Sequence, residues 1–280
     1  MRRLPLWQQV LAQLGLAVVG LFVIIPIWAM ARLALDEALT GAPLSFRLWP
    51  EHFSLQVFAD VWASPQHTIA FPGLLRNSLL IAGGAALTAV IAGTTVAYAF
   101  ARMRFPGQQV GLFGLLLGTL LPQVALLTPL YVLLTQLGIR ASPLGLITVY
   151  TAFSMPFCIW TMRAAFQAIP RELEEAALLE GAGALVAFRR IMLPLAAPAI
   201  AVAALLTFLV GYTEFAIGWL FIERGENATV AMAVSGLMSE GLVWNQISAL
   251  SLLMSAPVVV VFLVLRRLLL RGLLYGSIEG

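Results

Sequence analysis

The most closely spaced charged side chains lie in residues 169–194, a segment between two long apolar stretches. They are Arg171, Glu172, Glu174, Glu175, Glu180, Arg189 and Arg190. Acid–base, nucleophilic or metal chemistry would need such carboxylates next to histidine, cysteine, serine or a further cluster of metal ligands. The segment contains no histidine, cysteine or serine. Its charges are therefore better suited to contact with another protein than to catalysis.

The local pattern of this segment predicts two short helices joined by a bend. Pro170 suits the first turn of a helix, and the glutamates that follow are favoured near the positive helix end. Gly181 and Gly183 allow a left-handed backbone, which ends that helix after about three turns. We expect the second helix over Ala184–Met192, ending before Pro194.

The first of these helices offers a small, acidic surface. Leu173, Ala177 and Glu180 recur at helical spacing, and Ala176 next to Ala177 would let another molecule approach closely. An amphipathic helix lying on the membrane surface is the alternative, but such helices carry arginine or lysine on the polar face, and this one begins acidic. The residues alone leave both readings open.

The composition identifies the surroundings as a membrane. Of 280 residues, 61% are hydrophobic and 10% are charged, whereas soluble domains carry roughly 25% charged residues. All sixteen basic residues are arginine, so no P-loop can be completed, because that loop requires a lysine. A net charge of +3 does not suggest a nucleic-acid partner. Cys158, the single cysteine, lies in an apolar run and is expected to be a buried, inert thiol.

Six apolar stretches are long enough to cross about 30 Å of hydrocarbon. We predict an all-α membrane protein with one transmembrane domain over 1–280. The expected spans are 10–32, 74–100, 110–137, 144–168, 195–222 and 247–270. A cleavable signal peptide is the competing interpretation of the first stretch, which is however longer than the 7 to 15 apolar residues of such peptides.

The arginines predict the orientation. Six spans place both termini on one side of the membrane, together with residues 169–194. Eleven arginines fall on that side: Arg2, Arg3, Arg102, Arg104, Arg163, Arg171, Arg189, Arg190, Arg266, Arg267 and Arg271. Only five fall on the other: Arg32, Arg47, Arg76, Arg140 and Arg224. By the positive-inside rule, the termini and the charged segment are cytoplasmic.

The remaining polar residues give weak signals for chemistry. His52 and His67 lie without a matching cluster of ligands, so we expect no metal site and no catalytic residues. Glu214 is the one acidic residue well inside an expected span, where a charge costs about 2.5 to 3.5 kcal/mol unless it faces water or a partner. A secondary transporter would need more intramembrane ionisable groups, and a membrane-bound enzyme would need a nucleophile or metal constellation.

The charged segment resembles the EAA signature of the permease subunits of bacterial ABC importers, EAA-x3-G-x9-I-x-L-P. The matching residues are Glu175, Ala176, Ala177, Gly181, Ile191, Leu193 and Pro194. Further short runs extend the likeness over nearly the whole chain, and it is strongest to the MalG-like permeases of carbohydrate importers. Among them are Arg76-Asn77-Ser78-Leu79 and Pro129-Leu130-Tyr131.

The resemblance implies the partners and the role of the loop. They are a second, MalF-like permease subunit, a dimer of ATPase subunits that hold ATP and Mg, and an extracytoplasmic solute-binding protein, in a bacterial cytoplasmic membrane. This chain would bind no cofactor and would be a transport subunit, not an enzyme. The expected ATPase-coupling residues are Glu174, Glu175, Ala176, Ala177, Glu180, Gly181, Arg189 and Arg190. The segment 225–244 resembles one presented to the binding protein, and the C-terminal tail resembles one that reaches the ATPase pair.

The resemblance also suggests a solute. A sugar, as a di- or oligosaccharide, is the expected cargo, and glycerol phosphate or a polyamine is the alternative. Sugar-type relatives often carry Trp-Asn-Glu-Phe in the fifth span, whereas this chain has Tyr212, Thr213, Glu214 and Phe215. These four residues and Asn77 are the expected pathway residues.

Overall fold

The computed structural model describes residues 5–39, 41–43, 47–65, 69–120, 122–222, 225–240 and 243–276. Arg2, Arg3, His67, Arg224 and the tail from residue 277 lie outside these ranges. Within them the regular elements are helices, and an isolated bridge between Asp36 and Phe53 is the only β-type pairing. The prediction of an all-α fold is confirmed.

The chain divides into two compact units. Unit 1 comprises Met1–Phe71 and Ala233–Ser255, and unit 2 comprises Pro72–Met232 and Ala256–Gly280. We describe each unit by itself, and the expectation of a single domain stays a prediction.

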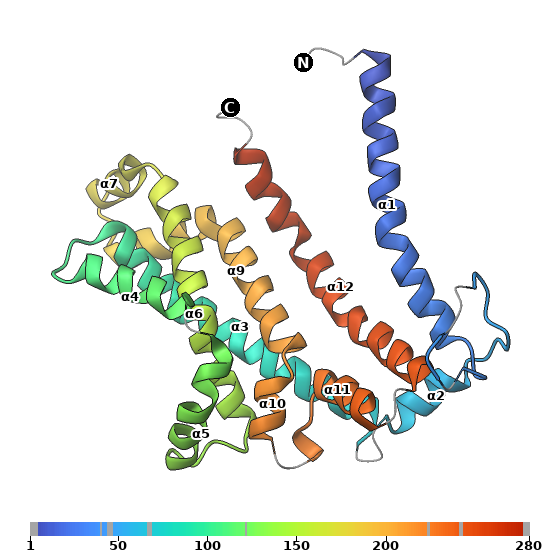
Figure 1. Ribbon diagram of the computed structural model, residues 1–280. Helices are drawn as coiled ribbons and strands as arrows, with labels where there is room; N and C mark the ends of the chain where they lie inside the picture. The colour runs from blue at the N-terminus through green and yellow to red at the C-terminus, as the bar shows by residue number, and fades with distance from the viewer. Residues whose placement is uncertain are drawn as a thin grey trace. The chain divides into compact units, whose positions relative to one another are not determined.

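Unit 1 contains the first membrane helix and a folded loop. Helix α1 spans Leu6–Ala34, and the short helix α2 spans Gln56–Ala63. Parts of α11 (Val230–Glu240) and α12 (Trp244–Gly276) complete the unit (Figure 1). The most apolar window of α1 has none of its residues buried, so this helix presents apolar side chains all round.

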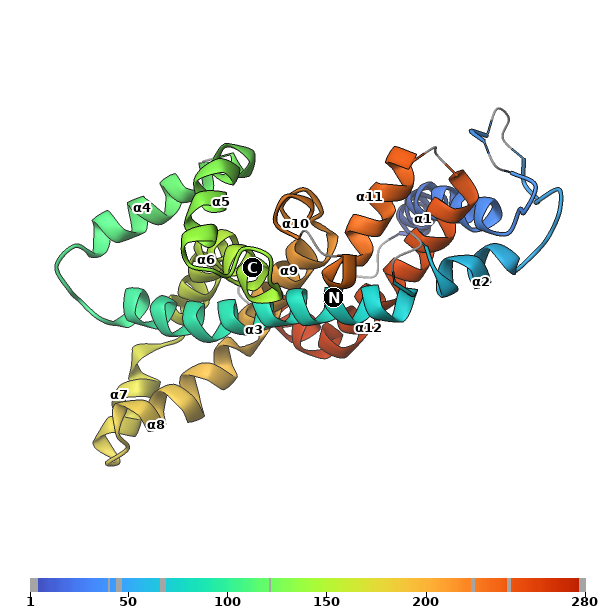
Figure 2. The ribbon, with the colours of Figure 1, turned by 90° about the horizontal axis from the view of Figure 1, so that it is seen from below.

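Unit 2 is built around helices α6 and α9. Its long helices are α3 (Phe71–Arg102), α6 (Pro143–Ala168) and α9 (Leu193–Thr213). Helices α6 and α9 pack along each other, and small and apolar residues of α3, α6 and α9 form the core (Figure 2). Cys158 is fully buried in this core, with its Sγ 3.2 Å from Thr207 Oγ1. The prediction of a buried thiol is confirmed.

The third expected span, 110–137, is not one continuous helix. It consists of α4 (Gln108–Leu120), a 3-10 turn over Gln123–Leu126 and α5 (Leu127–Gln136), with a bend of 100° between the two arms. Pro122 begins the 3-10 turn, where its missing N–H prevents the α-helical bonding from continuing. Hydropathy alone predicted the length of this stretch but not its break.

The fifth expected span, 195–222, is displaced toward the N-terminus. Its helix begins at Ala184 and runs through α8 (Ala184–Ala187), a π-helical turn over Phe188–Met192 and α9. The prediction that the second short helix ends before Pro194 is therefore wrong, because the helix continues through Pro194 to Thr213. The wide π turn directly before Pro194 is a place where a helix can tolerate a residue without an N–H. The helix ends at Thr213, and α10 (Ala216–Phe221) follows after a break.

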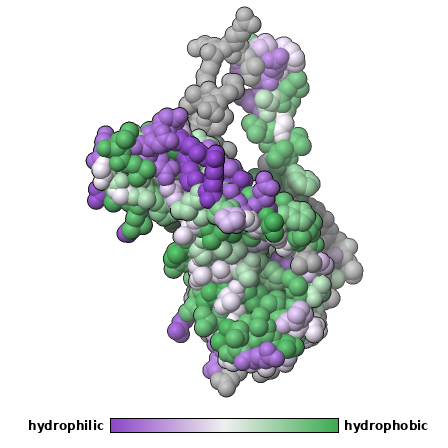
Figure 3. All heavy atoms as spheres, turned by 90° about the vertical axis from the view of Figure 1, so that its left-hand side faces the viewer, coloured by the Kyte–Doolittle hydropathy of each residue, from purple (hydrophilic) through white to green (hydrophobic). Residues whose placement is uncertain are grey.

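The surface of unit 2 separates by polarity. Figure 3 shows hydrophilic side chains gathered over the end that carries α7 (Arg171–Leu179), with a mostly hydrophobic surface beyond it. The apolar surface corresponds to helices long and apolar enough to cross a membrane. This arrangement places the charged segment at one edge of the membrane-spanning helices.

A close backbone contact between helices in unit 2 depends on Gly211. A Cβ placed on Gly211 would lie 3.2 Å from the Ala82 Cα of α3 and 3.4 Å from Tyr150 Cδ2 of α6. We predict that Gly211→Val lowers stability by about 1–3 kcal/mol, because the added methyl groups force the three helices apart. Gly114→Val is the matched control, since nothing lies within 4 Å of that Cβ position. The midpoint of thermal unfolding in detergent should fall for Gly211→Val only, and equal midpoints would contradict the packing described here.

Candidate functional site

The charged segment forms a loop whose first helix is held to α3 by Glu174. Residues 169–194 are called the docking loop below. The Tyr98 hydroxyl of α3 donates a hydrogen bond to Glu174 Oε1, and Arg102 Nε lies 3.3 Å from Glu174 Oε2. Arg102 Nη2 also donates to the Ile169 carbonyl at 2.6 Å. The Glu174 carboxylate and the Ile169 carbonyl thus attach the start of α7 and the end of α6 to the last turns of α3.

Three aromatic rings pack together next to the bond between Tyr98 and Glu174. The Tyr98 ring lies edge-on to Phe166 of α6, with centroids 5.6 Å apart, and 4.7 Å from Phe188 of the π turn. Phe166 is fully buried, and the side chains of Arg102 and Glu174 are 7% and 18% exposed. A charge pair this far from water is weakly screened and geometrically fixed. Helix α7 therefore rests on α3, α6 and the π turn together.

The structure separates the expected coupling residues into an inner and an outer group. Glu174 and Ala177 face inward, and Ala177 is buried. The exposed group consists of Glu175, Ala176, Glu180, Gly181, Arg189 and Arg190. The two alanines that we expected to form one small-residue surface thus lie on different sides of α7. The short sequence pattern does not show which side meets α3.

The bend of the docking loop uses only one of its two candidate glycines. Gly181 has φ +88°, a left-handed conformation that favours glycine. Gly183 instead has φ −68° and ψ 156° and precedes α8 as an extended residue. The prediction is confirmed for Gly181 and wrong for Gly183.

Exposed leucines on the docking loop were missed from the sequence. Leu179 is 89% exposed at the end of α7, and Leu178, Leu185 and Val186 are also exposed. Apolar side chains gathered on a polar surface are typical of a protein contact. The signal that could have found them is the Leu178-Leu179 pair directly before the Gly181 turn, where both side chains cannot face inward.

Glu214 lies in a break between two helices and not inside a continuous one. Its Oε2 accepts a hydrogen bond from the Tyr150 hydroxyl of α6 at 2.7 Å. Its Oε1 accepts from the backbone N–H of Ala216 at 2.8 Å and of Ile217 at 3.1 Å. The carboxylate therefore satisfies N–H groups at the start of α10 that have no partner within that helix. This internal bonding explains why α9 stops at Thr213.

The other expected pathway residues are divided by burial. The Tyr212 side chain is fully buried and stacks on Phe208, with ring centroids 5.3 Å apart. Thr213 and Phe215 are exposed. Thr213 lines a cavity of about 390 Å³ together with Gln123, Phe153, Ser154, Phe157, Leu206, Thr207, Leu209 and Val210. The cavity lining is uncharged, with two aromatic rings and several hydroxyl or amide groups.

Asn77 fastens the segment that precedes α11. Its Nδ2 donates to the carbonyls of Glu226 at 2.7 Å and Ala228 at 2.9 Å. The neighbouring Ser78 Oγ is fully buried and accepts from the Val230 N–H at 2.9 Å. Asn77 and Ser78 therefore fix residues 226–230 to α3. Among the described residues, no group of three His, Cys, Asp or Glu side chains is placed to hold a metal ion.

The inward bonding of Glu174 can be tested by hydrogen exchange. We predict that Glu174→Ala speeds amide exchange in residues 171–179 about tenfold or more, because hydrogen bonds to a charged group contribute about 1.5–3 kcal/mol. Glu172→Ala, an exposed carboxylate on the same helix, should leave the rates unchanged. Equal rates in the two variants, measured by mass spectrometry, would show that α7 does not depend on Glu174.

Comparisons with known proteins identify the family. Residues 89–275 match the model of the family described as binding-protein-dependent transport system inner membrane component. The chain is 33% identical to the maltose/maltodextrin transport system permease protein MalG of Salmonella typhimurium, over 96% of this chain and 95% of that protein. It is 36% identical to MalG of Escherichia coli K12 over 75% of this chain and 74% of that one. It is 29% identical to the trehalose/maltose permease protein MalG of Thermococcus litoralis, over 98% of each.

A solved structure agrees on the fold. The chain superposes with a TM-score of 0.72 on the crystal structure of a bacterial ABC transporter involved in the import of the acidic polysaccharide alginate, at 19% identity. The match covers 95% of this chain and 99% of that one. The resemblance to the permease subunits of carbohydrate ABC importers is confirmed, and the chain belongs to the binding-protein-dependent transport system inner membrane component family.

Proposed function

We propose that this chain forms half of the translocation pathway for a di- or oligosaccharide, delivered by an extracytoplasmic solute-binding protein. The other half would come from a MalF-like permease subunit. The names of the relatives, maltose/maltodextrin and trehalose/maltose permease proteins, support a sugar as the cargo. We place the complex in a bacterial cytoplasmic membrane with the termini and the docking loop on the cytoplasmic side, as the arginine distribution indicates.

We propose further that the docking loop couples transport to a separate ATPase dimer. The single observation that carries this proposal is the two-sidedness of α7, whose Glu174 is bonded to α3 while Glu175, Ala176 and Leu179 are exposed. An inner side fixed to a membrane helix and an outer side free for a partner are what force transmission requires. A pull on the outer side would act on α3 through Glu174, and on α6 and the π turn through the contacts of the Tyr98 ring with Phe166 and Phe188.

The energy source would lie outside this chain. The sequence lacks the lysine that a P-loop needs, so ATP and Mg are assigned to the partner ATPase. This chain would contribute positioning and motion, with no catalytic residue and no bound cofactor of its own. A secondary transporter is less well supported, because Glu214, the acidic residue within the fifth expected span, already bonds Tyr150 and the start of α10.

The uncharged cavity at Thr213 favours a neutral solute over the charged alternatives. Glycerol phosphate would call for arginine or a cluster of N–H donors, and a polyamine would call for carboxylates. The cavity lining offers Gln123, Ser154 and Thr213 for hydroxyl groups and two phenylalanines for the apolar faces of a sugar ring. Among the described residues, the buried Ser154 Oγ has no hydrogen-bond partner.

The coupling proposal predicts the effect of reversing one exposed charge. Glu175→Lys should reduce ATP-driven uptake in proteoliposomes more than tenfold and release the ATPase during purification, because a lysine would repel the surface that accepts the carboxylate. The permease should remain inserted, since Glu175 is exposed. Arg104→Glu, a charge reversal at an exposed position outside the docking loop, is the control and should keep uptake. Normal uptake and ATPase recovery with Glu175→Lys would contradict the proposal.

The solute is tested by uptake into proteoliposomes that contain the complete complex and its binding protein. We expect saturable, ATP-dependent accumulation of radiolabelled malto-oligosaccharides, with no accumulation of glycerol phosphate or spermidine. Uptake of a charged solute without any di- or oligosaccharide uptake would overturn the sugar assignment but would leave the coupling role standing.

A further inference from the structure

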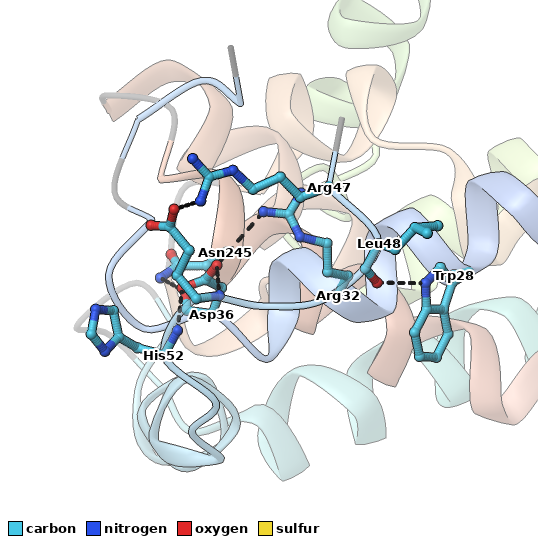
Figure 4. Close-up of polar contacts among 8 residues, drawn as sticks. Trp28, Arg32, Asp36, Arg47, Leu48, His52 and Asn245 are labelled. Carbon is cyan, nitrogen blue, oxygen red and sulfur yellow. Dashed lines mark hydrogen bonds and ion pairs between the residues drawn. The ribbon is translucent and has the colours of Figure 1, made fainter. Parts of the chain in front are cut away.

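A network of polar contacts in unit 1 folds a loop back on the C-terminal end of α1. Asp36, two residues past that helix, is 2% exposed. Its Oδ2 lies 3.7 Å from Arg32 Nη2 and accepts a hydrogen bond from the Glu51 N–H at 2.9 Å. Its backbone carbonyl accepts from Asn245 Nδ2 at 3.2 Å (Figure 4). Asp36 thus joins the end of α1, the loop and the start of α12.

Backbone pairing strengthens this fold. The Ser54 N–H donates to the Leu35 carbonyl at 3.0 Å, and the Glu37 N–H donates to the His52 carbonyl at 3.3 Å. Residues 35–37 and 52–54 therefore run side by side as a short antiparallel pair around Asp36 and Phe53. The loop is held by several independent bonds and has a defined position relative to α1.

The same loop touches a tryptophan of the membrane helix. Trp28 Nε1 donates to the Leu48 carbonyl at 3.0 Å, and the Trp28 and Trp49 rings meet edge to face with centroids 5.4 Å apart. In Figure 4, Trp28 and Leu48 lie to one side of Asp36 and His52 lies to the other. The loop therefore has a face that continues the surface of α1 and a face turned away from it.

The loop carries several exposed, large apolar side chains beside an exposed ion pair between Arg47 and Glu51. Trp49 is 71% exposed and Phe53 is 69% exposed, and Leu48 and Leu55 are exposed as well. We call residues 47–55 the anchor loop. Large apolar side chains at this density need an apolar or interfacial environment to cover them.

The tryptophans of α1 indicate which environment that is. Trp7 and Trp28 are 21 residues apart in one continuous helix, which is about 31 Å at 1.5 Å per residue. The hydrocarbon core of a bilayer is about 30 Å thick, and tryptophan is enriched at both of its boundaries. Both rings are exposed. The spacing therefore places Trp28 at a membrane–water boundary. Trp49 lies at the same boundary, because its ring contacts the ring of Trp28.

We propose that the anchor loop inserts its apolar side chains into the lipid interface and so fixes the depth and tilt of α1. Asp36 is the positioning residue, because its carboxylate holds the loop backbone against the helix end. The contact between Trp49 and Trp28, and the spacing of Trp28 from Trp7 that matches the thickness of a bilayer, favour lipid over a protein partner. This inference rests on the membrane span alone and does not depend on the solute or on coupling to an ATPase.

The depth of Trp49 tests the proposal. In a Cys158→Ser background, Trp28→Cys, Trp49→Cys and Glu37→Cys would each be spin-labelled in the complete complex in lipid nanodiscs. Oxygen, which concentrates in lipid, should relax the labels at 28 and 49 to a similar extent, several-fold more than a water-soluble nickel complex does. The label at Glu37, an exposed residue just past α1, should be relaxed mainly by nickel.

Two outcomes would overturn the proposal. One is a label at 49 as accessible to nickel as the label at 37. The other is a label at 49 that is shielded from both reagents only when the solute-binding protein is added, which would make the anchor loop a protein-docking surface. Adding Asp36→Ala to the Trp49→Cys variant should make the label more accessible to nickel. Measurement at Trp49 in the otherwise unchanged loop keeps the proposal testable if that variant does not fold.

Discussion

The position of α7 within unit 2 depends on the carboxylate of Glu174. It lies between the Tyr98 hydroxyl and the Arg102 guanidinium, largely out of water. Removing either partner would leave a nearly buried charge or hydroxyl unsatisfied, which costs more than the bond itself contributes. We therefore expect α7 to have two states, one bound to α3 in a single position and one detached from it. Helix α7 has nine residues, which is too short for a stable isolated helix, so without this attachment it would not keep a fixed direction.

The membrane imposes a second constraint, that backbone groups be satisfied where a helix breaks. The break after α9 meets it with a side chain, since Glu214 accepts the N–H groups at the start of α10 and the Tyr150 hydroxyl. The π turn before Pro194 meets it with a wider helical bond, from the Leu193 N–H to the Phe188 carbonyl. The π turn lies within the docking loop, and the break after α9 follows Thr213, which lines the uncharged cavity. Both irregularities therefore lie at sites to which we assign a function.

Much of this fold follows from the sequence. Hydropathy located the apolar stretches, and the glycine and proline positions predicted the bend of the docking loop at Gly181, because these are local properties of the chain. The sequence did not predict which side of α7 faces inward, because Glu174 and Glu175 are neighbouring residues of the same type. They are distinguished by the hydrogen bond from Tyr98, a residue 76 positions away in the sequence, to Glu174. Pro122 in an apolar stretch predicts a kink, but the 100° size of the bend does not follow from the sequence, because proline is common in nearly straight membrane helices as well.

The central claim is that α7 and the end of α3 move as one body. It is tested most directly by a distance between spin labels at Glu172→Cys in α7 and Thr95→Cys in α3, in a Cys158→Ser background. Pulsed electron resonance on the complete complex should give one narrow distance that is the same without nucleotide and with ATP bound. A distance that broadens or shifts between the two states would show that the docking loop moves independently of α3, and would contradict the account.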